Sequence, residues 1–493
     1  MSDSLRFALV LLVVGVTELA IILSNRLTER LKVPVPLLTL IAAAITARLI
    51  PSFRVSEEIA TRSVTVALVC ILFAGGMHIG AKRFRAAAIP IVLLGILGTF
   101  LITAGGTVLL NVAFGLGWYL SLLVATAVAP TDPAVVFSVL GKQEVAGLSG
   151  TVLEGESGTN DPVGISLMGA LLAAGGLTAA GVANAGIDFL LQMGLGAGVG
   201  IAGGLGLIAF MRRVPLPSEA LYPLRVLAVI FMLYGATTLA HGSGFLAVFV
   251  AGIVVGDARA PYKVEIERFH TALASLAEIF AFVVLGLTVN LSEIAKRDVW
   301  IPGVVLGVAL AFVIRPLFAG LCLIHSRLRA NERGFILFAG LKGAVPILLG
   351  LLLLQAEVPG AERLYGIVVV VVIVSVLLQG SLAVTVARYL RLPIRTAEAE
   401  PWSLGVRLRH EPEGVHRIRV QPGSAADGRS LRQLDELGEE AWVSFVVRES
   451  QLVPVTGGTR LRAGDELLIL AEPASMKRLL DIFGEHESGD HLR

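Results

Sequence analysis

The stretch Leu153-Glu-Gly-Glu-Ser-Gly-Thr-Asn-Asp-Pro162 places three carboxylates and an amide inside a long apolar span. An ionisable side chain at the centre of a membrane costs roughly 2.5 to 3.5 kcal/mol on insertion scales, so such residues usually line an ion or proton path. The stretch therefore predicts a membrane helix with a polar, functional face. A buried ion-pair cluster that only holds helices together is the alternative, but such a cluster rarely needs so many acids.

The spacing of these polar residues predicts how they group on the helix. Glu154, Ser157 and Asp161 share one face, because an α-helix repeats every 3.6 residues. Glu156 and Asn160 form a second pair, four residues apart, beside that face.

The rest of the chain has the composition of a polytopic helical membrane protein. Of its 493 residues, 55% are hydrophobic and 16% are charged, whereas soluble domains carry about 25% charged residues. Apolar runs recur through the first ~390 positions, and a length of ~20 residues for each membrane crossing predicts about thirteen spans. These predicted spans are 6–23, 34–51, 62–80, 87–113, 117–140, 147–174, 186–211, 219–240, 243–257, 270–291, 300–325, 333–356 and 364–388.

Alternate loops carry the basic residues, which predicts the orientation in the membrane. Lysines and arginines gather at 26–32, 82–85, 212–213 and 327–333, whereas the loops 114–118 and 175–185 carry almost no charge. Basic loops face the cytoplasm, so we expect the N-terminus outside and the C-terminus inside the cell membrane.

The first apolar segment lacks a basic n-region and a cleavage site, which favours a retained helix over a signal peptide.

From Glu398 the chain reads as a small soluble domain. Net charge falls from +7 over residues 1–397 to −5 over residues 398–493. Strand-like runs at 415–420, 441–447 and 466–471 and helical runs at 429–438 and 474–484 predict a β-α-β-β-β-α module. We therefore divide the chain into a transmembrane domain (1–390), a linker (391–402), a cytosolic α+β domain (403–485) and a disordered tail (486–493).

Two further polar interruptions predict broken membrane helices. Prolines flank Thr131-Asp132 in Ala129-Pro-Thr-Asp-Pro133, and a second break lies at Gly340-Leu-Lys-Gly-Ala-Val-Pro346. Unwound membrane backbone must face protein or a cavity, where its carbonyls and the Asp132 carboxylate suit a hard monovalent cation. The spans 87–174 and 300–388 each hold three helices with the break in the middle one, which indicates an inverted repeat. Lys342 either opposes Asp132 or lies solvated at a mouth of the pathway.

Other charged residues in the spans need partners. Arg315 lies deep in span 300–325, where an isolated guanidinium is costly, and Glu156 is the carboxylate that we expect to pair with it. Glu154 then lies near the edge of its span or forms a second pair. We expect Glu18, Arg225 and Glu278 to be structural partners or to lie near the interfaces, with a direct role in transport as the alternative.

One sequence pattern is discounted. Gly198-Val-Gly200-Ile-Ala-Gly203 fits G-x-G-x-x-G, but a dinucleotide site needs that pattern between a strand and a helix. Here it lies inside an apolar span, so we expect close helix packing through small residues. The two cysteines, Cys70 and Cys322, provide no disulfide framework and no metal-ligand spacing.

The breaks, the acidic stretch and the Arg315 span together resemble the NhaP-type branch of the sodium/hydrogen exchanger family. That resemblance implies thirteen helices, a homodimer and a mobile core that holds both broken helices. It also implies that Asp161 and Asp132 bind the cation or proton and that Ser157 and Thr131 complete the ligand shell. Asn160 and Glu156 would orient the site, with Glu156 paired to Arg315, whereas the roles of Lys342 and Glu154 stay open.

The sequence departs from the branch at two positions. Many relatives carry an acid before a Gly-Gly pair in the third helix, where this chain has Ala74. Lys342 also stands where many members carry arginine.

The tail resembles the TrkA-C module, the C-terminal lobe of RCK domains. Two segments carry this resemblance: Gly423-Ser-Ala-Ala-Asp-Gly-Arg-Ser-Leu-Arg-Gln-Leu and Thr459-Arg-Leu-Arg-Ala-Gly-Asp-Glu-Leu-Leu-Ile-Leu. Such modules dimerise and bind small regulatory ligands, including cyclic dinucleotides. No nucleotide-binding lobe precedes this one, so NAD is not expected. The combination is most similar to the potassium/proton antiporters.

The resemblance implies a secondary active antiporter, not an enzyme, that exchanges K⁺ or Na⁺ for H⁺ by alternating access of the elevator type. The cytosolic tail would regulate it through a small nucleotide or cyclic dinucleotide, and no other cofactor and no nucleic acid are expected. A potassium channel with the same tail is the first alternative, although no Thr-Val-Gly-Tyr-Gly filter is present. An intramembrane aspartic protease is a remote alternative, since its Gly-x-Gly-Asp motif is missing.

Overall fold

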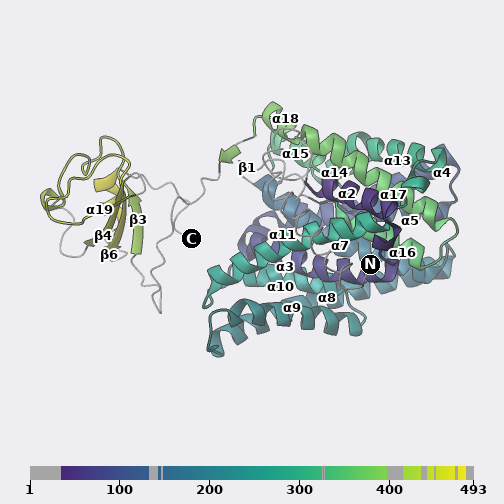
Figure 1. Ribbon diagram of the computed structural model, residues 1–493, viewed down its shortest axis with the longest axis horizontal. Helices are drawn as coiled ribbons and strands as arrows, with labels where there is room; N and C mark the ends of the chain where they lie inside the picture. The colour runs from purple at the N-terminus through teal and green to yellow at the C-terminus, as the bar shows by residue number, and fades with distance from the viewer. Residues whose placement is uncertain are drawn as a thin grey trace. The chain divides into compact units, whose positions relative to one another are not determined.

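The chain forms two compact units, 1–397 and 398–493. Their structure is a computed structural model that describes residues 35–132, 143–145, 148–324, 326, 328–392, 394–396, 415–434, 441–448, 451–471 and 476–484. The first unit is a bundle of helices, and the second is a small sheet with a helix (Figure 1). This division confirms the predicted fold class, a helical membrane protein with a small α+β domain.

The helices of the first unit follow the predicted spans. They are α2 (Val35–Leu49), α3 (Glu57–Val92), α4 (Thr99–Phe114), α5 (Trp118–Val128), α7 (Leu148–Ala174), α8 (Ala179–Arg213), α9 (Leu221–Leu239), α10 (Gly244–Gly256), α11 (Lys263–Thr288), α12 (Leu291–Ile294), α13 (Arg297–Ala309), α14 (Arg315–Cys322), α15 (Ala330–Phe338), α16 (Ala344–Gln355), α17 (Ala361–Ser375) and α18 (Ser381–Tyr389). Within the described residues, six helical segments are long and apolar enough to cross a membrane, and four shorter apolar helices accompany them. The predicted span 6–23 lies outside the described residues, so the count of thirteen stays a prediction.

The longest helical segment holds two of the predicted spans. Gly80 leaves the helical conformation inside α3, with φ 66° and ψ 163°. The Asp257 carboxylate lies against Gly80 and accepts a hydrogen bond from the Lys82 backbone N–H at 2.6 Å. That bond satisfies one of the amides that begin the next helical stretch, so the spans 62–80 and 87–113 are separated at this kink.

In the part of the chain that the structure describes, three helices widen into a π-helical turn, at η2 (Leu93–Gly98), η3 (Leu310–Ile314) and η4 (Val376–Gly380). A π-turn shifts the side chains that follow it around the helix axis, and such turns are frequent at functional sites. Arg315 directly follows η3, and Gln379 lies within η4. Both residues take part in the polar network described below.

Burial distinguishes the interior helix from those at the edge. α7, which carries the acidic stretch, is buried along most of its length, whereas α8 exposes many apolar side chains, as a lipid-facing helix does. α8, α9 and α10 run side by side along one edge of the unit (Figure 1).

The glycines of the G-x-G-x-x-G pattern lie inside α8, where they allow close helix packing; the pattern does not connect a strand to a helix. A Cβ on Gly200 would lie 2.7 Å from the Ala247 carbonyl oxygen of α10, whereas a Cβ on Gly198 would have no neighbour within 4 Å. Gly200 therefore permits the close approach of α10, as the discounted G-x-G-x-x-G pattern predicted.

The first unit also contains a short antiparallel strand pair, whose second strand lies near the unit's C-terminal end. β1 (Gln143–Val145) pairs antiparallel with β2 (Ile394–Thr396). The first strand belongs to the connection between α5 and α7, and the second lies within the predicted linker 391–402.

The second unit holds a four-stranded antiparallel sheet in the order β3-β6-β4-β5. Its elements are β3 (Val415–Arg419), η5 (Leu431–Gln433), β4 (Ala441–Arg448), β5 (Gln451–Val453), β6 (Glu466–Ala471) and α19 (Met476–Phe483). The three predicted strands and the final helix are therefore confirmed. A separate apolar core, which includes Ile418, Leu467 and Phe483, holds the sheet and α19 together.

The predicted helix 429–438 is wrong over its described part, which contains only the single 3₁₀ turn η5. The reason lies in the backbone amides. Leu431 N–H donates to the Thr459 carbonyl at 3.0 Å, and Arg432 N–H donates to the Gly457 carbonyl at 2.9 Å. Amides that bond to a neighbouring segment are not available for an α-helical ladder. Residues 435–438 lie outside the described residues.

The contrast between Gly200 and Gly198 yields a test of the helix packing. Gly200→Val should destabilise the protein by about 1–3 kcal/mol, because the added side chain forces α8 away from α10. Gly198→Val on the same helix is the matched control and should leave stability unchanged or raised. Thermal unfolding in detergent measures both, and equal midpoints would contradict the close packing.

Candidate functional site

The two broken helices meet at their breaks. α5 ends at Val128 and residues 129–132 are not helical, while α15 ends at Phe338 and residues 339–343 are not helical. The Asp132 backbone N–H donates to the Leu341 carbonyl at 2.8 Å. Both segments therefore leave the helical conformation where a break was predicted, and one backbone hydrogen bond joins them. Pro133 and the rest of the predicted span 117–140 lie outside the described residues.

The second break is shorter than predicted. It ends at Gly343 and not at Pro346, because Pro346 lies in the first turn of α16. The first amides of a helix have no partner within it, so a proline is tolerated there. Gly343 allows the contact with the other break, since a Cβ at this position would collide with the Asp132 carboxylate.

Lys342 joins the breaks a second time. Its side chain is buried, and Nζ donates to the Ala129 carbonyl at 2.9 Å. Of the two alternatives for Lys342, the structure excludes a solvated position at a mouth of the pathway. The ammonium instead occupies the first break and interacts electrostatically with Asp161.

Asn160 ties the first break to α7. Its Nδ2 donates to Thr131 Oγ1 at 2.8 Å, and its Oδ1 accepts from the Thr131 backbone N–H at 3.3 Å. Both ends of the amide are thus used on one residue. Asn160 therefore fixes the first break beside the helix that carries Asp161.

Two carboxylates and two hydroxyls gather where the breaks and α7 meet. Asp161 is buried and Asp132 half-buried, and their like charges interact electrostatically. Ser157 lies one helical turn before Asp161 and is also buried. Two acids in one low-dielectric site favour the binding of a positive ion or a proton, and oxygen atoms are the ligands that hard cations prefer.

Arg315 and Glu156 form the predicted ion pair. Arg315 Nη1 donates to Glu156 Oε1 at 2.6 Å and Nη2 to Oε2 at 2.9 Å, with side-chain exposures of 1% and 2%. Arg315 Nη2 also donates to the Ile336 carbonyl at 3.2 Å, near the end of α15. The pair is bidentate and buried, so each charge neutralises the other.

Glu154 lies at the edge of the site. Its Oε1 is 3.7 Å from His78 Nε2, and the His78 side chain is largely exposed. Glu154 lies near the start of its span and also forms a second pair, with His78, so the two predicted alternatives occur together.

The remaining membrane charges divide between structure and site. Arg225 packs against the rings of Phe210 and Tyr222 and donates to the Val214 carbonyl at 2.7 Å, which is a structural role. Glu278, in α11, interacts electrostatically with Asp132. Glu18 lies outside the described residues.

The sequence analysis did not identify two residues of this network. Ser375 Oγ accepts a hydrogen bond from the Lys342 backbone N–H at 3.1 Å, and Gln379 Nε2 donates to the Phe338 carbonyl at 2.7 Å. The sequence did contain a signal for them: Ser375 interrupts the otherwise apolar run 367–378, and Gln379 follows that run four residues later.

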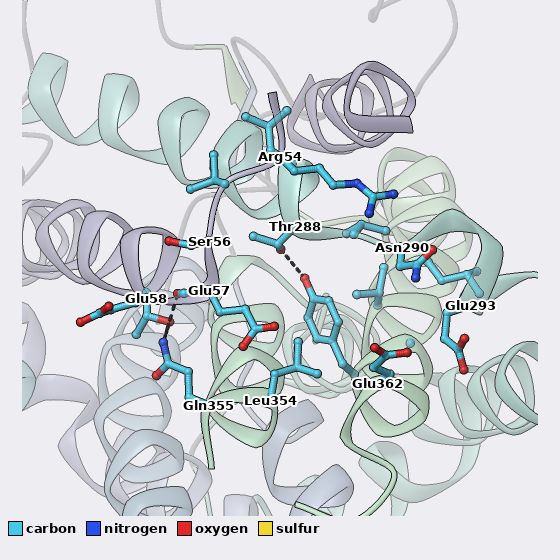
Figure 2. A pocket seen from close by; sticks show the side chains of 18 of the residues that line it. Arg54, Ser56, Glu57, Glu58, Thr288, Asn290, Glu293, Leu354, Gln355 and Glu362 are labelled. Carbon is cyan, nitrogen blue, oxygen red and sulfur yellow. Dashed lines mark hydrogen bonds between the residues drawn. The ribbon is translucent and has the colours of Figure 1, made fainter. Parts of the chain in front are cut away.

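A separate cavity of about 850 Å³ lies away from the two aspartates. Figure 2 shows Glu57, Glu293 and Glu362 around it, with Thr288 between them. Its walls come from the start of α3, the end of α11, α12, the end of α16 and the start of α17.

Two polar contacts join helices across this cavity. Gln355 Nε2 donates to the Glu57 carbonyl at 3.1 Å and to Thr61 Oγ1 at 2.8 Å. Thr288 Oγ1 and the Tyr365 hydroxyl lie 2.7 Å apart. Neither Asp132 nor Asp161 lines the cavity, so it is separate from the place where the two aspartates meet.

Known families match both units. Residues 16–389 match the family described as "Sodium/hydrogen exchanger, transmembrane". Residues 415–484 match the TrkA-C domain.

Curated relatives match most of the chain. It is 30% identical over 470 residues to a protein of Shewanella sp. named "K(+)/H(+) antiporter NhaP2", covering 94% of this chain and 81% of the relative. It is 35% identical over 393 residues to "K(+)/H(+) antiporter NhaP" of Alkalimonas amylolytica, covering 78% and 67%. "Na(+)/H(+) antiporter 1" of Methanocaldococcus jannaschii is 30% identical, covering 68% and 82%.

A solved structure has the same fold. The sodium proton antiporter MjNhaP1 of Methanocaldococcus jannaschii superposes with a TM-score of 0.62 at 24% identity, covering 76% of this chain and 99% of that chain. At this identity the likeness shows the architecture of the membrane unit.

The buried ion pair yields a quantitative test. Arg315→Ala should cost about 3–5 kcal/mol of stability, because it leaves the Glu156 charge buried without its partner. Arg363→Ala, which breaks the exposed pair with Asp298 at 3.3 Å, is the matched control and should cost under about 1 kcal/mol. Thermal unfolding in detergent measures both changes.

A double-mutant cycle separates the pair from the rest of the network. The combination of Arg315→Ala with Glu156→Gln should cost less than the sum of the two single changes, since neither charge is then left alone. Strictly additive effects would show that the two side chains do not stabilise each other.

Proposed function

We propose that this protein, which belongs to the sodium/hydrogen exchanger family, is a secondary active antiporter that exchanges a monovalent cation, K⁺ or Na⁺, for H⁺. The observation that carries the proposal is the meeting of three segments: the Asp132 amide bonds to the second break, and Asn160 bonds Thr131 to the helix that carries Asp161. An enzyme is not proposed, since a transporter of this kind makes and breaks no covalent bond in its cargo.

Exchange follows from competition at the carboxylates. Asp161 and Asp132 bind either a cation or a proton, because the negative charge that attracts one is neutralised by the other. Ser157 and the Thr131 backbone supply further oxygen ligands. Asn160, Glu156 and Arg315 orient the site, and Lys342 occupies the first break next to it.

Alternating access moves this site between the two faces of the membrane. We propose an elevator-type motion in which the helices that carry both breaks move as one body. The hydrogen bonds from Asp132 to Leu341 and from Lys342 to Ala129 support this, because they join the two broken helices. With the basic loops in the cytoplasm, the N-terminus lies outside.

Potassium is the favoured cation of the two. The relatives named as K⁺/H⁺ antiporters match up to 97% of the chain, whereas the relative named as a Na⁺/H⁺ antiporter matches 68% of it. Both ions take oxygen ligands, so the residues of the site alone do not separate them.

We further propose that the TrkA-C domain regulates transport and assembles the protein as a homodimer. Its sheet leaves Trp442 and Leu470 exposed, at 72% and 41%, and these residues are cross-strand partners. An apolar sheet face of this kind suits pairing with a second copy about a two-fold axis. A small nucleotide or cyclic dinucleotide that prefers one arrangement would shift the transport activity.

The essential carboxylate provides the first functional test. Asp161→Asn should abolish cation-dependent proton movement in proteoliposomes, because the amide has the same shape without the charge that both ions need. Asp188→Asn is the matched control, since Asp188 is exposed on α8. If Asp161→Asn exchanged ions at the wild-type rate, Asp161 would not belong to the site. If the unmutated protein passed net current without a pH change, it would be a channel and not an antiporter.

Truncation tests the role of the tail. A chain that ends at Ala397 keeps β2 and its pairing with β1. It should remain folded and exchange ions, with a changed dependence of the rate on cation concentration, when assayed in proteoliposomes. A profile identical to that of the full chain would reduce the domain to an assembly role, and a folded but inactive protein would make the tail part of the transport machinery.

A further inference from the structure

The second break leaves backbone groups without helical partners in the interior of the membrane unit. The last carbonyls of α15 and the amides after it are not bonded within a helix. Each such group costs several kcal/mol in hydrocarbon unless another donor or acceptor reaches it. Four of them have partners on other elements: Ile336 carbonyl with Arg315, Phe338 carbonyl with Gln379, Leu341 carbonyl with Asp132, and Lys342 N–H with Ser375.

Two of these partners are linked to each other. Ser375 Oγ donates to Gln379 Oε1 at 2.7 Å. The bonds thus form a chain in which Lys342 N–H donates to Ser375, Ser375 donates to Gln379, and Gln379 donates to Phe338. Ser375 and Gln379 are 2% and 1% exposed, so no solvent competes for these bonds.

The Ser375 hydroxyl makes an unusual bond for a helical residue. Serine and threonine in a helix commonly return their hydroxyl to the carbonyl four residues earlier. Among the described residues, four buried hydroxyls do so: those of Thr99, Thr107, Thr159 and Thr237. Ser375 instead accepts from the Lys342 N–H of the break and donates to the Gln379 side chain, so its hydroxyl does not return to a carbonyl of its own helix.

Lys342, whose backbone N–H bonds to Ser375, lies next to the proposed ion site. Lys342, whose amide is fixed by Ser375, reaches the Ala129 carbonyl of the first break, and its neighbour Leu341 accepts from the Asp132 amide. The charged groups that act on Lys342 are Arg315, Glu156 and Asp161. A shift of the backbone at Leu341 and Lys342 would therefore move both contacts that align the two breaks.

We propose that Ser375 and Gln379 are positioning residues for the exchange: they clamp the second break so that the Asp132 and Ala129 backbone stays arranged for cation binding. This inference rests on the proposed function, because it names residues that act on the same cation site. Ser375 and Gln379 touch no cation themselves and act through Leu341 and Lys342.

A loosened clamp weakens cation binding without removing a ligand. Apparent affinity falls in proportion to the fraction of molecules in the binding-competent arrangement. If the break is correctly arranged about a tenth to a third of the time, the half-saturating cation concentration rises about threefold to tenfold. The maximal rate stays near that of the wild type, since saturating cation selects the competent arrangement.

The test compares four purified proteins in proteoliposomes: the wild type, Ser375→Ala, Ser375→Thr and Ser121→Ala. Ser121 is the matched control, because its buried hydroxyl donates to the Leu116 carbonyl at 3.0 Å, at the other end of α5 from the break. Proton movement is recorded over a range of K⁺ and of Na⁺ concentrations. We expect Ser375→Ala alone to raise the half-saturating concentration, with Ser375→Thr close to the wild type.

The outcomes separate this inference from the proposed function. Wild-type protein that moves no protons in response to cations would refute the antiporter itself. Wild-type exchange with equal half-saturating concentrations for Ser375→Ala and Ser121→Ala would refute only the clamp. Should Ser375→Ala fail to fold, Gln379→Met takes its place, because it removes only the side-chain amide that bonds to Ser375 and Phe338. A raised half-saturating cation concentration for Gln379→Met supports the clamp, and an unchanged concentration overturns it.

Discussion

The hydrogen bond between the Asp132 amide and the Leu341 carbonyl is the constraint on which the membrane unit depends. Two helices can lose their ladder in the interior of a membrane protein only if the freed groups find partners. Here each break supplies partners to the other, and α7, α14 and the α17–η4 segment supply more. Each break therefore satisfies part of the backbone that the other leaves free, and this holds the two segments against each other.

The charges at the site are sorted into two groups. Arg315 is committed to Glu156 by two short hydrogen bonds, and this neutral pair fixes α7 against the end of α15. The Asp161 carboxylate is attracted by the positive charge of Lys342 and repelled by the negative charge of Asp132. The Arg315–Glu156 pair is thus neutral, and the charged groups that act on Asp161 are Asp132 and Lys342.

The sequence predicted much of this arrangement. Prolines beside Asp132 and in the run that contains Lys342 identified both breaks, and the cost of an isolated guanidinium identified the pair of Arg315 and Glu156. It could not predict the chain of Ser375 and Gln379, because which helix lies beside a break is set by tertiary packing. The position of Lys342 stayed open for the same reason. The failed helix at 429–438 shows that local propensity yields to amide partners elsewhere in the chain.

The strand pair of Gln143–Val145 with Ile394–Thr396 has a mechanical consequence. The second strand ends just before the soluble domain begins, and the first lies in the segment that connects the helix before Asp132 to the helix that carries Asp161. The chain that leads to the soluble domain is therefore anchored on the connection between those two helices, and not on a helix of the bundle.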